Sequence, residues 1–186
     1  MSRIHVFPNW RGNPYLNMLY IGARSEGWNV DGTTQLEDLI KELPSLGVND
    51  IFHIHWTSPI LQSAPNRREA RNALTRFTKA IVAGIDRGMH VVWTVHNSIP
   101  HDVKYVDLEV GLAEFLTEVS SRIIQLSRGT KQAVSEFYDL PSAKLATLRH
   151  ASYVGVYSEP PTQVIARAQL GVPRSSPTIG FVGQMR

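Results

Sequence analysis

The chain has 186 residues, of which 42% are hydrophobic, enough to build one sizeable core or one domain and the start of another. It has no cysteine, which excludes disulfides, thiolate nucleophiles and cysteine-bound zinc. The net charge of +3 is too small for a dedicated nucleic-acid binder. No apolar run reaches the roughly 18 residues of a membrane span, and the first residues lack a signal-peptide pattern, so we expect a cytoplasmic protein.

Strand-like and helix-like segments alternate along the chain. The first predicted helix begins with Asn13 as its N-cap and Pro14 at its first position. Strands that alternate with helices predict an α/β fold with a mostly parallel sheet covered by helices on both faces. In chain order the pattern predicts strand 3–7, helix 13–28, helix 33–43, strand 50–56, helix 66–86, strand 90–96, a helix around residues 108–119, strand 122–127, helix 129–137, strand 144–149 and helix 162–172.

The composition changes near the end of the chain. Residues 173–177 are rich in Pro, Ser and Arg, which is typical of a linker between domains. An apolar segment at residues 178–183 follows and reads as one more strand. We therefore predict one domain over residues 1–172, and a linker with the first strand of a second domain over residues 173–186.

Polar and aromatic residues follow the predicted strands. In an open parallel sheet, ligands bind at the carboxyl ends of the strands, so these residues are the functional candidates. They include few carboxylates, which suits a polyhydroxylated, phosphate-bearing ligand better than metal-dependent hydrolysis. The candidates are residues 9–13 and 55–58, His96, Asn97, His101, Ser127, His150, Ser152 and Tyr153.

Two of these patterns have both a functional and a structural interpretation. The backbone amides of Gly12 and Asn13 can cradle an oxyanion at a helix start, or Asn-Pro can serve only to begin the helix. His53 and His55 lie on one face of a strand, where two imidazoles can bind a metal. Because no carboxylate nearby completes a ligand set, we expect them to be held by hydrogen bonds beside a helix, and we predict no metal site.

Two further features also allow alternatives. Trp10 and Trp56 either stack on sugar rings or only fill the edge of the sheet. The helix at residues 66–86 carries a row of cations that forms either a solvated face or a contact with an anionic membrane surface. These cations are Arg67, Arg68, Arg71, Arg76 and Lys79.

The order of the segments resembles the N-terminal domain of a retaining GT-B glycosyltransferase of the large family 4 type. The likeness rests on GWNV after the first helix, NDIFHIHW where the family has an Asp-hydrophobic-His-x-His strand, and VVWTVHN for its Thr-x-His strand end. IIQLSRGTKQAV and PTIGFVGQMR match its strand-serine-helix segment and the strand that opens its second domain. The resemblance spans almost the whole chain and implies a Rossmann-like sheet, one half of a GT-B fold, with residues 1–172 as the acceptor-side domain.

The resemblance also implies an activity. The whole enzyme would move a sugar from a nucleotide sugar, a co-substrate rather than a bound cofactor, to a saccharide or lipid-linked saccharide acceptor in polysaccharide or glycolipid synthesis. His96 would contact the transferred sugar and orient it, without acting as a nucleophile. Arg11, Gly12 and Asn13 match the loop near the donor phosphates and the acceptor. The remaining expected substrate-binding residues are Trp56, Asn97, His101 and His150.

The sequence departs from the family pattern at two places. RGN at residues 11–13 stands where the family has paired glycines, and LRHASYVGVY puts His150 where an Asn-Gly is expected. The family's nucleotide-contacting residues lie in the second domain, so we expect residues 1–186 alone to be inactive. The enzyme would work in the cytoplasm, at the inner face of a membrane where its acceptor is lipid-linked.

Two other classes of protein stay open. One is a standalone flavodoxin-like module that binds a small ligand or regulates a partner without catalysis. The other is one half of a nucleotide-sugar epimerase or dehydrogenase, against which the lack of a G-x-G-x-x-G fingerprint counts.

Overall fold

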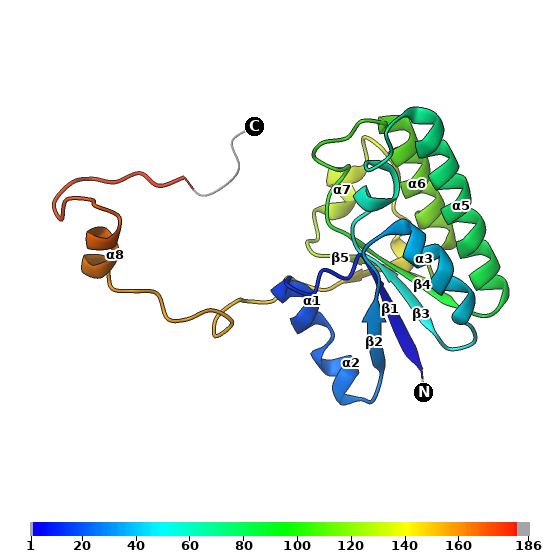
Figure 1. Ribbon diagram of the computed structural model, residues 1–186, viewed down its shortest axis with the longest axis horizontal. Helices are drawn as coiled ribbons and strands as arrows, with labels where there is room; N and C mark the ends of the chain where they lie inside the picture. Colours follow the sequence, from blue (N-terminus) through cyan, green and yellow to red (C-terminus); the bar gives the residue numbers. More distant parts are fainter. Residues whose placement is uncertain (1, 182–186) are drawn as a thin grey trace. The chain divides into compact units, whose positions relative to one another are not determined.

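The computed structural model describes residues 2–181, and the chain divides into two compact units, Met1–Ala151 and Ser152–Arg186 (Figure 1). The first unit is an α/β fold on a six-stranded sheet in the order β2-β1-β3-β4-β5-β6. Every pair of neighbouring strands is parallel. The predicted fold class is confirmed, and the sheet is wholly rather than mostly parallel.

The strands are short and lie close to their predicted positions. They are β1 (Arg3–Phe7), β2 (Asn29–Gly32), β3 (Ile51–Ile54), β4 (His90–Val95), β5 (Arg122–Gln125) and β6 (Leu145–Thr147). The sequence pattern gives no range for β2, an edge strand whose residues NVDG lack alternating apolar side chains. The strand order reverses between β1 and β3, and such a reversal opens a crevice at the carboxyl ends of the strands.

The first predicted helix is two helices in the structure. Asn13 caps α1 (Pro14–Leu19) by accepting a hydrogen bond from the Tyr15 backbone N–H at 3.0 Å, which confirms the predicted start. The chain leaves the helical path at Tyr20, and α2 (Ile21–Ser25) follows it.

The other predicted helices of the first unit occur in their predicted order, and the short helix at Ser58–Leu61 was not predicted. Asn66 caps α5, as its predicted start requires, by accepting from the Glu69 backbone N–H at 3.0 Å. α3 is shorter than predicted because it begins at Leu36 rather than at residue 33, and Pro44 lies in a 3₁₀ turn after its end. These elements are α3 (Leu36–Glu42), η1 (Leu43–Ser45), α4 (Ser58–Leu61), α5 (Arg67–Asp86), α6 (Val106–Val119), α7 (Thr130–Val134) and η2 (Ser142–Lys144).

Helices cover both faces of the sheet, but unequally. The larger core lies under α3, α5 and α6, and the smaller one under α1 and α2 (Figure 1). Side chains alternate along a strand, so Phe52 and Ile54 of β3 enter the larger core. His53 lies between them in β3, and Thr94 lies between Trp93 and Val95 in β4. Both therefore point to the face that α1 covers.

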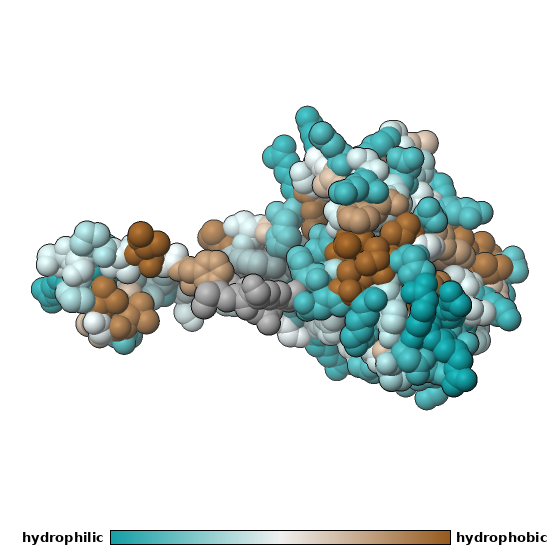
Figure 2. All heavy atoms as spheres, turned by 90° about the horizontal axis from the view of Figure 1, so that it is seen from above, coloured by the Kyte–Doolittle hydropathy of each residue, from teal (hydrophilic) through white to brown (hydrophobic). Residues whose placement is uncertain are grey.

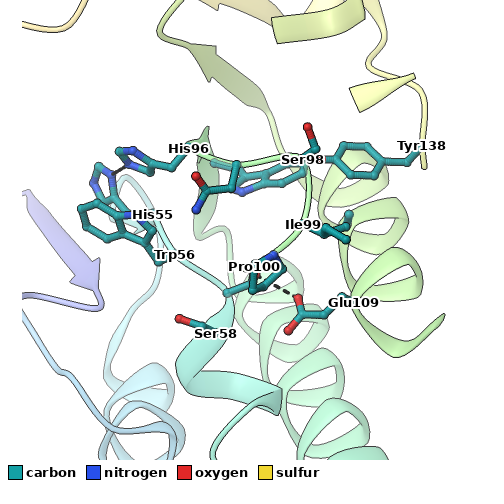
Figure 3. Close-up of a pocket in the computed structure, with 13 residues that line it drawn as sticks. His55, Trp56, Ser58, His96, Ser98, Ile99, Pro100, Glu109 and Tyr138 are labelled. Atoms are coloured by element: carbon teal, nitrogen blue, oxygen red, sulfur yellow. Dashed lines mark hydrogen bonds between the residues drawn. The ribbon is translucent and has the colours of Figure 1, made fainter. Parts of the chain in front are cut away.

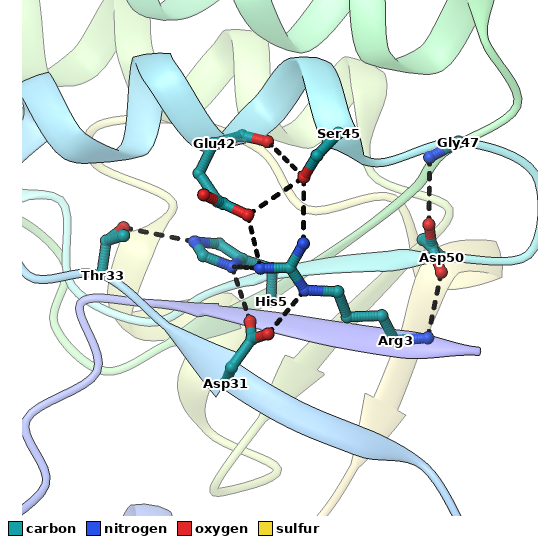
Figure 4. A network of polar contacts seen from close by, with 8 residues as sticks. All are labelled: Arg3, His5, Asp31, Thr33, Glu42, Ser45, Gly47 and Asp50. Atoms are coloured by element: carbon teal, nitrogen blue, oxygen red, sulfur yellow. Dashed lines mark hydrogen bonds and ion pairs between the residues drawn. The ribbon is translucent and has the colours of Figure 1, made fainter. Parts of the chain in front are cut away.

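A polar network ties the edge strand β2 to its neighbours (Figure 4). The Arg3 guanidinium donates to Asp31 at 2.6 Å and to Glu42 at 2.7 Å. His5 is buried, and its Nδ1 lies 2.8 Å from an Asp31 oxygen and 3.3 Å from an Arg3 nitrogen. We assign the His5 Nδ1–H as a donor to Asp31, because a carboxylate can only accept. The Arg3 nitrogen then lies near His5 Nδ1 without donating to it. The network joins β1, β2 and α3 at the amino edge of the sheet.

The second unit, described up to residue 181, contains α8 (Gln163–Gln169) and has no buried residue in that range. Its apolar side chains are largely exposed, among them Val154 at 91% and Leu170 at 77% (Figure 2). Residues 178–181 of the predicted strand 178–183 form no strand, and residues 182–183 lie outside the described part. The predicted domain boundary after residue 172 stays a prediction.

Gly32 lets β2 approach the end of β1. A Cβ atom at this position would lie 2.1 Å from the Val6 carbonyl oxygen and 2.8 Å from the Asn9 Cβ. We therefore expect Gly32→Ala to lower the free energy of unfolding by about 1–3 kcal/mol, the usual cost of overpacking. Urea unfolding checks this, with Gly22→Ala as the control, since a Cβ there meets nothing within 4 Å. Equal midpoints for the two variants would contradict the close approach.

Candidate functional site

A small pocket lies at the carboxyl edge of the sheet, beside the reversal of strand order. It has a volume of about 40 Å³, room for a water molecule or two rather than for a whole sugar nucleotide. Figure 3 shows His55, Trp56 and His96 on one side of it and Glu109 and Tyr138 on the other. The full lining is His55, Trp56, Thr57, Ser58, Trp93, His96, Asn97, Ser98, Ile99, Pro100, Glu109, Ala113 and Tyr138.

Aromatic rings gather around His96. The Trp56 indole stacks on the imidazole with the ring centroids 4.1 Å apart and the planes at 17°. The Tyr15 ring of α1 meets the His96 ring edge-on, with the ring centroids 5.2 Å apart. The His150 ring also contacts Tyr15, at a centroid distance of 4.9 Å. The structure thus brings three predicted residues, His96, Trp56 and His150, to one aromatic cluster, although the sequence places them far apart.

Imidazoles in and just after β3 and β4 form a continuous hydrogen-bonded chain through Tyr20. The Tyr20 hydroxyl lies 2.7 Å from His53 Nδ1 and 2.8 Å from His55 Nε2. At the inner end, His53 Nε2 lies 2.9 Å from the Thr94 hydroxyl. At the outer end, His55 Nδ1 lies 3.1 Å from His96 Nε2. His53 and His55 are therefore held by hydrogen bonds from a residue at a helix end, as expected from the sequence.

Burial keeps these groups uncharged at neutral pH. It lowers the pKa of His53 to about 3 and that of His96 to about 4, and neighbouring imidazoles add to both effects. The pKa of His55 is likewise far below its usual value, because of burial first and then the nearby His53 and His96. Burial raises the pKa of the Tyr20 phenol well above its usual value. The cluster offers neutral donors and acceptors rather than a charged nucleophile.

The pocket also contains a buried carboxyl group that the sequence analysis did not single out. Glu109 of α6 is 3% exposed and accepts hydrogen bonds from Thr57 at 3.0 Å and from Gln62 at 2.5 Å. Burial raises the pKa of Glu109, and the two hydrogen bonds, which lower it, offset this only in part. One signal existed, because Glu109 lies four residues before Ala113 on the inward face of a predicted helix.

The predicted loop residues lie in a different hollow. Arg11 and Gly12 line an open groove together with Trp10, Thr33 and Thr34. The groove is linked to the aromatic cluster, since the Trp10 and Trp56 rings lie 4.7 Å apart.

The other predicted residues vary in their placement. The Asn13 side chain caps α1, so its oxygen already has a donor. Asn97 lines the pocket, whereas His101, in the same loop, is exposed and lines neither hollow. Within residues 2–181 no group of three or more His, Asp or Glu side chains is placed to hold a metal ion. The prediction of no metal at His53 and His55 stays a prediction.

Known proteins match this chain in fold only. No protein-family model matches the sequence, and no curated protein matches it. The chain is similar to the crystal structure of Anabaena Alr3699/HepE in complex with UDP and glucose, with a TM-score of 0.55 and 12% identity. The match covers 92% of this chain and 50% of that one, so the chain spans about half the length of the HepE chain. At this identity the likeness shows a shared fold, as expected for one half of a GT-B structure.

Two further structures are more distant. A member of the lipolytic G-D-S-L family from Veillonella parvula has a TM-score of 0.38 and 14% identity over 92% of this chain and 84% of its own. The ydeN gene product of B. subtilis has a TM-score of 0.39 and 10% identity over 92% of this chain and 100% of its own. Neither similarity carries an argument about this chain.

The buried imidazoles predict a pH-dependent stability. Between pH 6.5 and the folded pKa of about 3, His53 is protonated in the unfolded chain and neutral in the folded one. The free energy of unfolding is therefore full above pH 6.5 and falls by about 1.4 kcal/mol per pH unit below it for this residue. Urea unfolding between pH 7 and pH 5 measures how the free energy of unfolding changes with pH. Below pH 6.5 this change should be smaller in His53→Gln by about 1.4 kcal/mol per pH unit.

The control for this measurement is Asn72→Ala, which changes an exposed side chain on α5 without removing a titrating group. It should keep the wild-type slope. A His53→Gln variant with the wild-type slope would mean that His53 binds its proton equally well in the folded chain.

Proposed function

We propose that this chain is the acceptor-side half of a retaining glycosyltransferase of the family 4 type. The complete enzyme transfers a sugar from a nucleotide sugar to a saccharide or lipid-linked saccharide. The observation that carries the proposal is the stack of Trp56 on a neutral His96 at the carboxyl edge, where the strand order reverses. A flat aromatic face beside neutral hydrogen-bonding groups is suited to a sugar ring.

The fold comparison supports the same proposal from another direction. HepE was solved with UDP and glucose, the two parts of a nucleotide sugar, and this chain matches half of it. A pocket of about 40 Å³ encloses too little of a sugar nucleotide to bind it alone. A second domain that closes over the carboxyl edge would complete the site and hold the nucleotide. The exposed apolar side chains of residues 152–181 fit a segment that continues into such a domain.

The residues then have distinct roles. His96 orients the transferred sugar, Trp56 stacks on the His96 ring, and Asn97 lines the same pocket. Arg11, Gly12 and Asn13 lie near the donor phosphates and the acceptor, and His101 and His150 bind substrate. A pKa of about 4 leaves His96 neutral at pH 7, which suits a hydrogen-bonding role.

A second candidate function is a standalone small-ligand module. The strand order 2-1-3-4-5 is shared with flavodoxin-like proteins, which bind ligands at the same reversal between β1 and β3. Such a module would bind its ligand without transferring a sugar. A transfer assay on the protein that carries both halves separates the two functions.

The proposed lipid-linked acceptor depends on the cations of α5. Arg67 pairs with Asp107, and Arg76 donates to Glu37 through two contacts of 2.6 Å. Arg68 pairs with Glu69. Within the described residues only Arg71 and Lys79 of these five cations form no ion pair, so less charge remains for an anionic surface than the sequence indicates. None of the helices described has the length and apolar content that a membrane span requires.

The first test concerns His96. In the protein that carries both halves, His96→Ala should lower sugar transfer by about 10- to 1000-fold, because one positioned polar contact to the reacting sugar is lost. The matched control is His90→Ala, since His90 is an exposed histidine at the opposite end of the same strand. Transfer rates are measured with a labelled nucleotide sugar. A His96→Ala rate equal to that of the control would remove His96 from the site.

The second test concerns the membrane surface. Vesicles with anionic lipid should bind the protein, and added salt should weaken that binding. Arg71→Glu should weaken it more than Arg122→Glu, the same charge change at an exposed residue outside α5. Co-sedimentation measures both. Equal binding to neutral vesicles, or no binding to either kind, would rule out an electrostatic membrane contact.

A further inference from the structure

Five side chains join the interior of the sheet to the pocket, and we call them the relay: Thr94, His53, Tyr20, His55 and His96. Each neighbouring pair is within hydrogen-bond distance, from 2.7 to 3.1 Å. Both ring nitrogens of His53 and of His55 are engaged. The inner members are buried, with Thr94 at 0% and His55 at 1% exposure, so water cannot supply a missing partner.

The proton count of the relay leaves only two arrangements. A neutral imidazole has one N–H and one bare nitrogen, and a hydroxyl donates one hydrogen. If the Tyr20 oxygen accepted from both imidazoles, its buried O–H would lack an acceptor, because among the described residues this hydroxyl has no hydrogen-bond partner except His53 and His55. The Tyr20 hydroxyl therefore donates to one imidazole and accepts from the other. Once its direction is chosen, every other hydrogen bond in the relay points the same way. The tautomer of His96 is thus coupled to a hydroxyl on the far side of His55.

Thr94 decides between the two directions. In the outward direction Thr94 donates to His53, and each further group donates to the next, until His55 Nδ1–H donates to His96 Nε2. In the inward direction Thr94 only accepts, and its own O–H needs another acceptor. Among the described residues the Thr94 hydroxyl has no hydrogen-bond partner except His53. A buried donor without an acceptor is unfavourable, so the outward direction is the stable one.

We infer that the relay holds His96 in the Nδ1–H tautomer, so that this imidazole presents a hydrogen-bond donor to a ligand oxygen. Tyr20 is the positioning residue, because its hydroxyl accepts from His53 and donates to His55 and so couples the tautomers of the two imidazoles. Thr94 fixes that direction.

The Nδ1–H tautomer limits what His96 can do in the pocket. His96 Nε2 already accepts from His55, and Nδ1 carries the proton, so neither nitrogen is available as a base or nucleophile. Nδ1 makes no hydrogen bond within residues 2–181, and His96 lines the pocket. The ligand atom that fits there is an acceptor, such as a hydroxyl or phosphate oxygen. Its assignment to a sugar rests on the proposed function, whereas the tautomer itself does not.

The experiment reads the tautomers directly. Long-range ¹H–¹⁵N spectra of the ¹⁵N-histidine-labelled chain, at pH 7 and without ligand, separate protonated from unprotonated ring nitrogens. We expect the Nδ1–H form for His53, His55 and His96, in contrast to the Nε2–H form that free histidine prefers. An Nε2–H signal for His96 in the wild-type chain would overturn the inference.

Two variants test the coupling. Tyr20→Phe removes the bridging hydroxyl, and Thr94→Val removes the terminal donor with little change of shape. In each, the His96 signals should move toward an average of the two tautomers or toward Nε2–H. The control is Tyr105→Phe, which removes a tyrosine hydroxyl that donates to the Ala64 carbonyl outside the relay. It should leave all three tautomers unchanged.

The outcomes separate this inference from the proposed function. If Tyr20→Phe and Thr94→Val both fold, by circular dichroism, and both keep His96 as Nδ1–H, the relay does not set the tautomer, whatever the transfer assay gives. If Tyr20→Phe does not fold, Thr94→Val alone decides. If the tautomers respond as expected while no sugar is transferred by the complete protein, the relay stands and the proposed function fails.

Discussion

The hydroxyl group of Tyr20 joins two buried imidazoles, and the site depends on that pair of hydrogen bonds. Strand alternation sends His53 and His55 to the face of the sheet that α1 covers, where a polar group without a partner would destabilise the fold. Tyr20 supplies the partner from the point where α1 ends and α2 begins. The same contact fixes α1 against β3. It thereby sets Tyr15 beside His96 and His150, so the packing of the helix and the arrangement of the aromatic cluster have one cause.

The sequence was sufficient for most of the fold. Alternating segments give the parallel sheet, and side-chain caps such as Asn66 mark true helix starts. β2 could not be found because an edge strand of four residues buries too little apolar surface to leave an alternating pattern. The break at Tyr20 could not be found either, since a helical period does not reveal that one residue bonds to a strand more than thirty positions away.

The site was predictable in part, for a geometric reason. His96 and Trp56 follow neighbouring strands, and parallel strands end at one edge, so their meeting follows from the topology. Loop residues are different, because a loop can turn away within a few positions, as it does between Asn97 and His101. Glu109 comes from a helix rather than from a strand end, so a search limited to strand ends misses it. The fold is shared by proteins of several functions, so the function has to be argued from these side chains.

The measurement that tests the proposed site most directly is a titration of the ¹⁵N-labelled protein that carries both halves with a series of nucleotide sugars, followed by NMR chemical shifts. We expect saturable changes that gather at the Trp56 indole N–H, the His96 ring and the Asn97 amide, and that are absent in His96→Ala. Changes that never saturate, or that gather at the amino edge of the sheet around Arg3 and Glu42, would contradict a sugar site at the carboxyl edge.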